Sequence, residues 1–282
     1  MAEYIFIVGA GRSGTKVLRD CLGASARVAC IPYDIGYVWS RGSESLQHDE
    51  LKADGISARQ RHYIRETICR FGRKAARGME FDIVIEKSVP NSLRPLYVKT
   101  VFPEAKLIHI VRDGRCVIES AMRNWDSPSD KGYFIDKLRY FPLRSIPYAL
   151  WYAKNKINFG SKSAKLWGPR YKGMQCDANE KQLIEVCTQQ WIRCVETCEK
   201  QLLQMPSSDV LQIRYEDFID DPATLKRICS FANIRVEGEV EHFYARYVEP
   251  YKGNACVDSL SQDQLMFIER QAAVVLARYG YT

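Results

Sequence analysis

Apolar and polar positions follow two periodicities along this chain, and these predict its elements. Continuous apolar runs predict buried strands at about 4–8, 27–31, 81–86, 107–111 and 210–214. Apolar residues at helical spacing predict helices at about 14–22, 57–77, 90–102, 113–123, 180–204, 223–232 and 262–279. The repeated order of strand and helix through residue 124 predicts an α/β fold with helices flanking a parallel sheet.

A glycine-rich turn joins the first predicted strand to the first helix. The first N–H groups of a helix have no internal partner and lie at its positive dipole end, so they favour an anion, most often a phosphate. Small residues let the main chain approach that anion, and basic and hydroxyl side chains add donors. The residues concerned are Gly11, Arg12, Ser13, Gly14, Thr15 and Lys16.

Three kinds of anion loop share this outline. Residues 9–14 fit the dinucleotide pattern G-x-G-x-x-G, and Asp34 falls about where that fold places a ribose-binding acid. A nucleoside-triphosphate loop ends in G-K-[ST], whereas Thr15 and Lys16 stand in reverse order, which disfavours a nucleotide kinase. Residues 12–15 fit the 5′-phosphosulfate loop of sulfotransferases, in which a basic residue precedes Ser-Gly-Thr. The loop alone leaves the first and third interpretations open.

Other polar residues follow the predicted strands and are expected to converge on this turn. In an open parallel sheet, ligands bind beyond the carboxyl ends of the strands. Asp34, Glu86, Lys87 and Arg112 all fall just past such ends. Ser120 lies about two helical turns after Arg112, so a guanidinium and a hydroxyl can grip one phosphate from two sides.

Composition narrows the class of protein. With 282 residues, 46% of them hydrophobic, the chain is expected to form a single domain over residues 1–282. Its net charge of +7 suits an anionic ligand and does not by itself indicate nucleic acid. No apolar run approaches the roughly 20 residues that span a bilayer. The first apolar stretch, about five residues, is too short for a signal peptide.

The ten cysteines are expected to be reduced thiols in the cytoplasm, because the sequence shows no signal peptide. No C-x-x-C pair occurs. Cys187, Cys194 and Cys198 share one helical face with Trp191, which favours burial in the core over a metal site. No metal is predicted.

Residues 125–179 differ in composition from the rest of the chain. Between Lys131 and Lys172 there are ten basic residues and one acid, with ten aromatic residues interleaved. Aromatic faces stack on sugars or bases, and cations meet phosphate, sulfate or carboxylate groups. We expect this basic, aromatic insertion to be a helical cap on the acceptor side of the site. A solvated cap with an aromatic core is the alternative.

Two of these blocks together resemble the sulfotransferases that use 3′-phosphoadenosine 5′-phosphosulfate (PAPS). Residues 9–15 look like the 5′-phosphosulfate loop, and residues 111–115 with Ser120 look like the 3′-phosphate motif. The resemblance implies a P-loop-like sulfotransferase fold, with PAPS as co-substrate and adenosine 3′,5′-bisphosphate (PAP) as product.

The resemblance extends toward the C-terminus. Residues 213–217 are similar to a third family block, which implies that Tyr215 lies near the adenine. Lys252 and Gly253 fall where the family's basic loop covers the cofactor, and residues 259–279 are similar to its closing helix.

Catalytic roles also follow from the resemblance. Lys87 matches a family lysine that bridges the phosphosulfate and stabilises the transition state, and Arg12 takes the place of the loop's basic residue. A base removes the acceptor's proton as the sulfuryl group passes in line. We place Asp34 as that base, and expect Glu86 to hold Lys87 and His109 to be structural. Three residues of the same loop are alternative bases: His48, Asp49 and Glu50.

The sequence therefore predicts a PAPS-dependent sulfotransferase acting on an acceptor hydroxyl. A saccharide or another polar or anionic acceptor is favoured, with a peptide or small molecule possible and nucleic acid not expected. The alternatives are a dinucleotide-binding oxidoreductase and a non-catalytic nucleotide or nucleic-acid binding protein.

Overall fold

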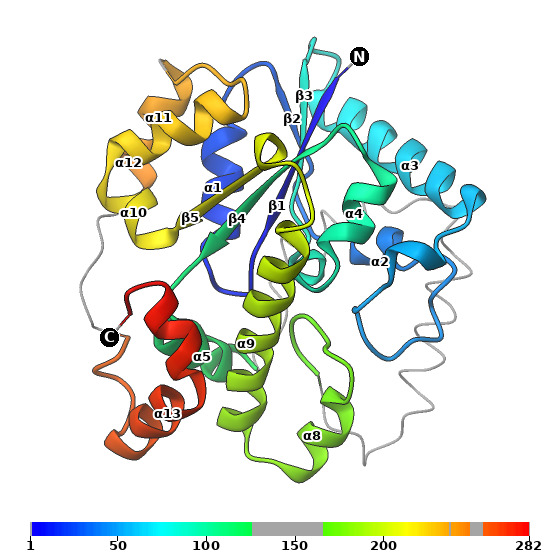
Figure 1. Ribbon diagram of the computed structural model, residues 1–282. Coiled ribbons are helices and arrows are strands. Elements are labelled where there is room, and N and C mark those ends of the chain that lie inside the picture. The colour runs from blue at the N-terminus through cyan, green and yellow to red at the C-terminus, as the bar shows by residue number, and fades with distance from the viewer. Residues whose placement is uncertain (1, 126–165, 237, 249–255, 282) are drawn as a thin grey trace.

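The computed structural model describes residues 2–125, 166–236, 238–248 and 256–281 (Figure 1). A five-stranded parallel sheet with the order β2-β3-β1-β4-β5 lies at the centre of this part of the chain. The strands are β1 (Glu3–Val8), β2 (Val28–Cys30), β3 (Ile83–Glu86), β4 (Lys106–Val111) and β5 (Val210–Arg214). The predicted α/β class and the five predicted strands are confirmed.

The strand order bears on the dinucleotide interpretation of the anion loop. β1 pairs with β3 on one side and with β4 on the other. The chain therefore passes from β1 to the edge strand β2, and β3 then lies between β2 and β1. A dinucleotide fold has the order 3-2-1-4-5-6, in which β2 lies beside β1. The sheet therefore disfavours a dinucleotide-binding oxidoreductase.

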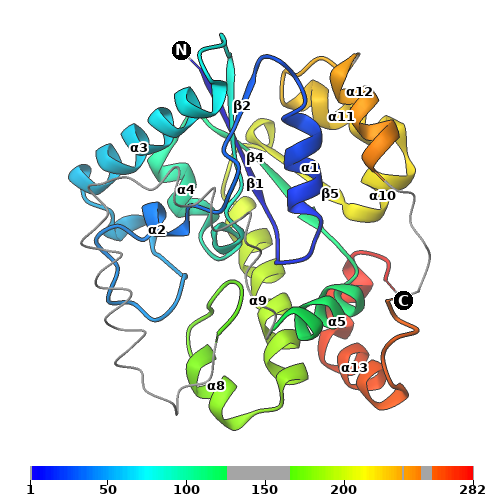
Figure 2. The same cartoon turned by 180° about the vertical axis from the view of Figure 1, so that it is seen from behind.

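Helices cover both faces of the sheet (Figures 1 and 2). Alternate β1 side chains enter two separate cores, as the strand period of two requires: Tyr4 and Phe6 enter one, Ile5 and Ile7 the other. The first core is closed by α2 (Gly36–Trp39), α3 (Ala58–Ala76), α4 (Pro95–Val101) and α9 (Leu183–Leu202). The second is closed by α1 (Thr15–Leu22), α10 (Tyr215–Asp220), α11 (Pro222–Phe231) and α12 (Glu239–Tyr247).

A third core lies beyond the carboxyl ends of the strands. It joins the N-terminal part of α9 to α5 (Gly114–Asn124), α8 (Met174–Glu180) and α13 (Gln262–Arg278). Trp191 and Cys194 of α9 are buried in it, in agreement with the predicted core role of that helical face. Ser261 caps α13 and forms a capping box with Gln264.

Two predicted segments differ from the structure. The helix expected at 90–102 is divided into a 3-10 turn (Val89–Leu93) and α4, because Pro95 lacks an N–H and restricts the backbone of Arg94. The segment after β2, which was expected to be a loop, contains the short helix α2. Tyr33, before this helix, and Trp39, at its end, are fully buried. None of the helices among the described residues is long and apolar enough to cross a membrane.

Candidate functional site

The predicted anion turn connects β1 to α1 at the carboxyl edge of the sheet. Arg12 and Gly14 have positive φ angles of 71° and 85°, with Ser13 between them. Left-handed residues in such a turn direct main-chain N–H groups toward a common concavity, which binds anions. The Ser13 hydroxyl is buried and has no hydrogen-bond partner among the described residues. A phosphate or sulfate oxygen at this turn would satisfy it.

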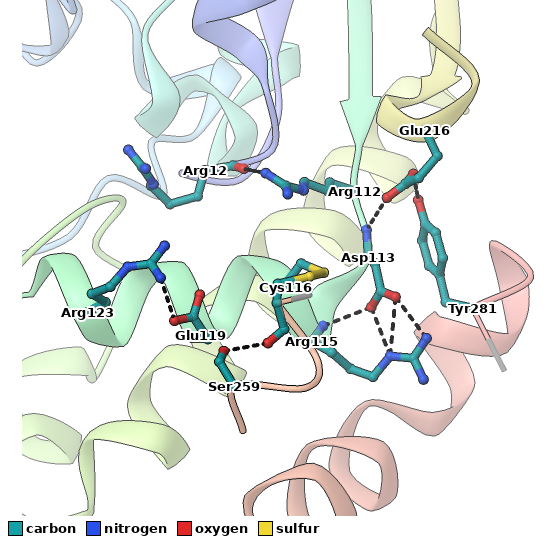
Figure 3. The surroundings of a disulfide bond; sticks show 11 residues. Arg12, Arg112, Asp113, Arg115, Cys116, Glu119, Arg123, Glu216, Ser259 and Tyr281 are labelled. Atoms are coloured by element: carbon teal, nitrogen blue, oxygen red, sulfur yellow. Dashed lines mark hydrogen bonds and ion pairs between the residues drawn. A yellow bond between two sulfur atoms is a disulfide. The ribbon is translucent and has the colours of Figure 1, made fainter. Parts of the chain in front are cut away.

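The turn and the predicted 3′-phosphate motif lie together (Figure 3). Arg12 Nε donates a hydrogen bond to Ser120 Oγ of α5 over 2.9 Å, although 108 residues separate them. Arg112 Nη1 donates to the carbonyl oxygen of Arg12 over 3.3 Å. The structure thus brings together Arg12, Arg112 and Ser120 at one point.

This point carries surplus positive charge. Neither Arg12 nor Arg112 has a carboxylate within ion-pair distance in the described part of the chain. Partial burial lowers the pKa of Arg12, and repulsion from Arg112 and Arg123 lowers it further. Arg123 itself pairs with Glu119 over 2.9 Å. Crowded guanidinium groups without acids are stabilised by a bound dianion.

Tyr215 forms one wall of the turn. The guanidinium of Arg112 lies 4.6 Å from the centroid of its ring, a cation–π contact. A side chain at Gly14 would overlap the same ring, so glycine is required there by contact as well as by φ. The next residue, Glu216, is held by the Asp113 N–H over 3.1 Å and by the Tyr281 hydroxyl over 2.6 Å.

The predicted catalytic pair lies on the neighbouring strand end. Lys87 follows β3 and is 8% exposed. Its Nζ lies 2.5 Å from Asp34 Oδ1 in the loop after β2. The Val89 N–H also points to Asp34 Oδ2, over 3.4 Å. Asp34 and Lys87 are thus brought together from positions 53 residues apart.

Two of the three alternative bases are engaged elsewhere. Asp49 is buried and pairs with Arg170 over 3.1 Å, and Arg94 and Arg170 hold its pKa below the usual range despite burial. Glu50 accepts from Arg193 over 3.0 Å. His48 has a buried Nδ1 without a partner in the described structure. Asp34 is the one of these four that contacts Lys87.

The remaining predictions concern two buried residues. Glu86 was expected to hold Lys87, but its carboxylate accepts hydrogen bonds from Ser88 and from Asn91, and Asp34 pairs with the lysine instead. Burial raises the pKa of Glu86 to about 7. His109 is buried within β4, where desolvation lowers its pKa to about 3, which agrees with a structural role.

The end of the basic, aromatic insertion reaches the anion turn. Trp167 lies beside Gly11: its ring is 3.3 Å from where a β-carbon on that glycine would stand. Trp167 also packs near Trp125, with 6.3 Å between ring centroids. Sequence reasoning did not single out Trp167, since only the fold places it there. Most of the insertion, residues 126–165, and the predicted Lys252 and Gly253 lie outside the described residues.

A disulfide joins Cys116 of α5 to Cys256, with 5.1 Å between their α-carbons (Figure 3). The expectation of reduced thiols is wrong for this pair. Disulfides persist mainly in oxidising compartments, so this bond counts against the predicted cytoplasmic location. Among the described residues, no group of three or more histidine, cysteine or acidic side chains is arranged to hold a metal.

Part of the chain is similar in sequence to known sulfotransferases. Residues 4–140 match the model of a family described as the sulfotransferase family. Protein-tyrosine sulfotransferase 1 of Danio rerio is 33% identical over 128 residues, which cover 41% of this chain and 34% of the relative. The match thus spans about a third of that relative's length.

Solved structures extend the likeness to nearly the whole chain. The sulfotransferase domain from the curacin biosynthetic pathway has a TM-score of 0.51 at 16% identity, over 97% of this chain and 98% of that one. Mouse sulfotransferase SULT7A1 complexed with PAP has a TM-score of 0.50 at 15% identity, over 98% and 85%. The sheet and its helices therefore define the P-loop-like fold of sulfotransferases. The match to the sulfotransferase family model covers residues 4–140, just under half of the chain.

Proposed function

We propose that this protein transfers a sulfuryl group from PAPS to a hydroxyl of a polar or anionic acceptor. The observation that carries the proposal is the meeting of Arg12, Arg112 and Ser120 at the anion turn, where neither arginine has a carboxylate within ion-pair distance among the described residues. A nucleotide bearing both 3′- and 5′-phosphate groups supplies the charge that this cluster lacks.

The residues at the turn suit separate groups of the donor. The buried, unpartnered hydroxyl of Ser13 and the main chain from Gly11 to Gly14 suit the 5′-phosphosulfate, together with Thr15 and Lys16. Arg112 and Ser120 suit the 3′-phosphate, and Tyr215 suits the base. PAPS brings an activated sulfuryl group whose transfer requires little covalent work from the protein.

Lys87 and Asp34 are proposed to serve the transfer itself. In this mechanism Lys87 Nζ donates a hydrogen bond to the departing phosphate oxygen and stabilises the charge that develops there. Asp34 takes the proton of the acceptor hydroxyl, and its contact with Lys87 supports this role. Arg12 adds a second cation at the phosphosulfate.

The acceptor is proposed from charge and from the relatives. Ten basic residues against one acid between Lys131 and Lys172 favour a saccharide or another anionic acceptor. The curated relatives are named protein-tyrosine sulfotransferases, which favours a protein or peptide acceptor containing tyrosine. Trp167, beside Gly11, offers an aromatic face to either kind of ring.

The test is incubation with radiolabelled PAPS and a panel of an acidic tyrosine peptide, a glycosaminoglycan and a simple phenol. We expect label on the peptide or glycan, and none with Lys87→Ala, although that variant should still bind PAP. Lys226→Ala, an exposed lysine of α11, is the matched control and should retain activity. Thermal shifts with NAD but not with PAP would refute the proposal.

A further inference from the structure

A buried polar chain connects the lysine turn to the loop that carries Asp34. Glu86 and Ser88 flank Lys87 in sequence, and both are almost wholly buried, at 1% and 0% exposure. The Ser88 hydroxyl accepts a hydrogen bond from the Ile35 N–H over 2.8 Å and donates one to Glu86. Ser88 therefore binds the peptide next to Asp34 directly to the end of β3.

Glu86 is itself fixed from the other side. Asn91 Nδ2 donates to its second oxygen over 3.2 Å, and Asn91 Oδ1 accepts from Arg94 Nε over 2.9 Å. The Arg94 side chain is fully buried, and its guanidinium is 3.9 Å from Asp49. A carboxylate without an ionic partner in direct contact is costly to bury, and its pKa of about 7 reflects that cost. Groups with strongly shifted pKa values cluster at functional sites.

We propose that Ser88 and Glu86 are positioning residues that hold Asp34 in register with Lys87. This inference rests on the proposed sulfuryl transfer, and it assigns both residues an indirect role. Without the Ser88 hydroxyl, the Ile35 N–H loses its acceptor, and Asp34 stays attached to this turn only through Lys87 and Val89. A displacement of about 1 Å at a reacting group can cost on the order of a hundredfold in rate.

Ser88→Ala is the direct test, and Ser92→Ala is its control. Ser92 is also 0% exposed and lies in the 3-10 turn that follows Ser88, but its hydroxyl donates a hydrogen bond to the Val89 carbonyl over 2.8 Å. We expect Ser88→Ala to lower kcat at least tenfold while the Kd for PAP changes less than about twofold. Glu86→Gln keeps one oxygen for the Ser88 hydroxyl, so it should lose less activity than Glu86→Ala.

The measurements are kcat with radiolabelled PAPS and the acceptor that the panel identifies, the Kd for PAP by calorimetry, and Tm. An unchanged kcat in Ser88→Ala would overturn the inference. So would a loss of kcat, PAP affinity and Tm together in both serine variants, which indicates general destabilisation. Absence of transfer by the wild-type protein would refute the proposed function itself, and the inference with it.

Discussion

The disulfide between Cys116 and Cys256 makes a strong prediction about stability. It closes a sequence separation of 140 residues and attaches the first turn of α5 to the segment that precedes α13. In the chain-entropy model, a cross-link over such a loop stabilises the fold by about 5 kcal/mol. A chain of 282 residues has an unfolding entropy of about 0.6 kcal/mol/K, so breaking the bond should lower Tm by about 8 °C.

Thermal unfolding with and without a phosphine reductant tests this magnitude. Cys116→Ser should show the lower Tm in both conditions, whereas Cys176→Ser, which removes an exposed free thiol, should behave as the wild type. Thiol titration of the unfolded protein should count eight free cysteines before reduction and ten after it. Ten thiols before reduction, or a Tm unaffected by Cys116→Ser, would refute the reasoning.

Three further changes have expected outcomes. Gly14→Ala places a side chain against the Tyr215 ring at a positive φ, so calorimetry should show at least about tenfold weaker PAP binding. The pKa of Glu86 is raised to about 7, so the folded protein binds the Glu86 proton more tightly than the unfolded chain does. Protonation of Glu86 therefore stabilises the fold fully below about pH 4.5, and this stabilisation is lost as the pH rises through 7. Glu86→Gln should remove that loss in urea unfolding at pH 5 and 8, and an equal pH dependence in both proteins would contradict it. Ser261→Ala removes the α13 cap and should cost about 1 kcal/mol in the same assay, whereas no loss would show that the cap does not contribute.

The strands and the anion turn could be predicted from the sequence because both have local sequence signals. A continuous apolar run is typical of a strand buried on both faces of a parallel sheet. A glycine turn with hydroxyl and basic residues after such a run is typical of an anion-binding site. The meeting of Arg112 with the turn followed from the rule that strand ends converge at one edge.

Other features depend on contacts that have no local signal. Asp49 looked like a loop acid, and only the fold shows that Arg170 engages it. Tyr33 and Trp39 lie outside the strands and helices that the apolar pattern predicts, yet their side chains complete a core. The Cys116–Cys256 bond spans 140 residues, so no spacing in the sequence could indicate it.

The most direct test of the account compares the affinity for PAP with that for adenosine 5′-phosphate, which lacks the 3′-phosphate. Charge-assisted contacts from Arg112 and Ser120 should make wild-type binding of PAP roughly 10- to 100-fold tighter. Arg112→Ala should reduce that preference to a few-fold, whereas Arg227→Ala, an exposed arginine of α11, should leave it intact. Equal affinity of the wild-type protein for the two nucleotides would contradict the central claim.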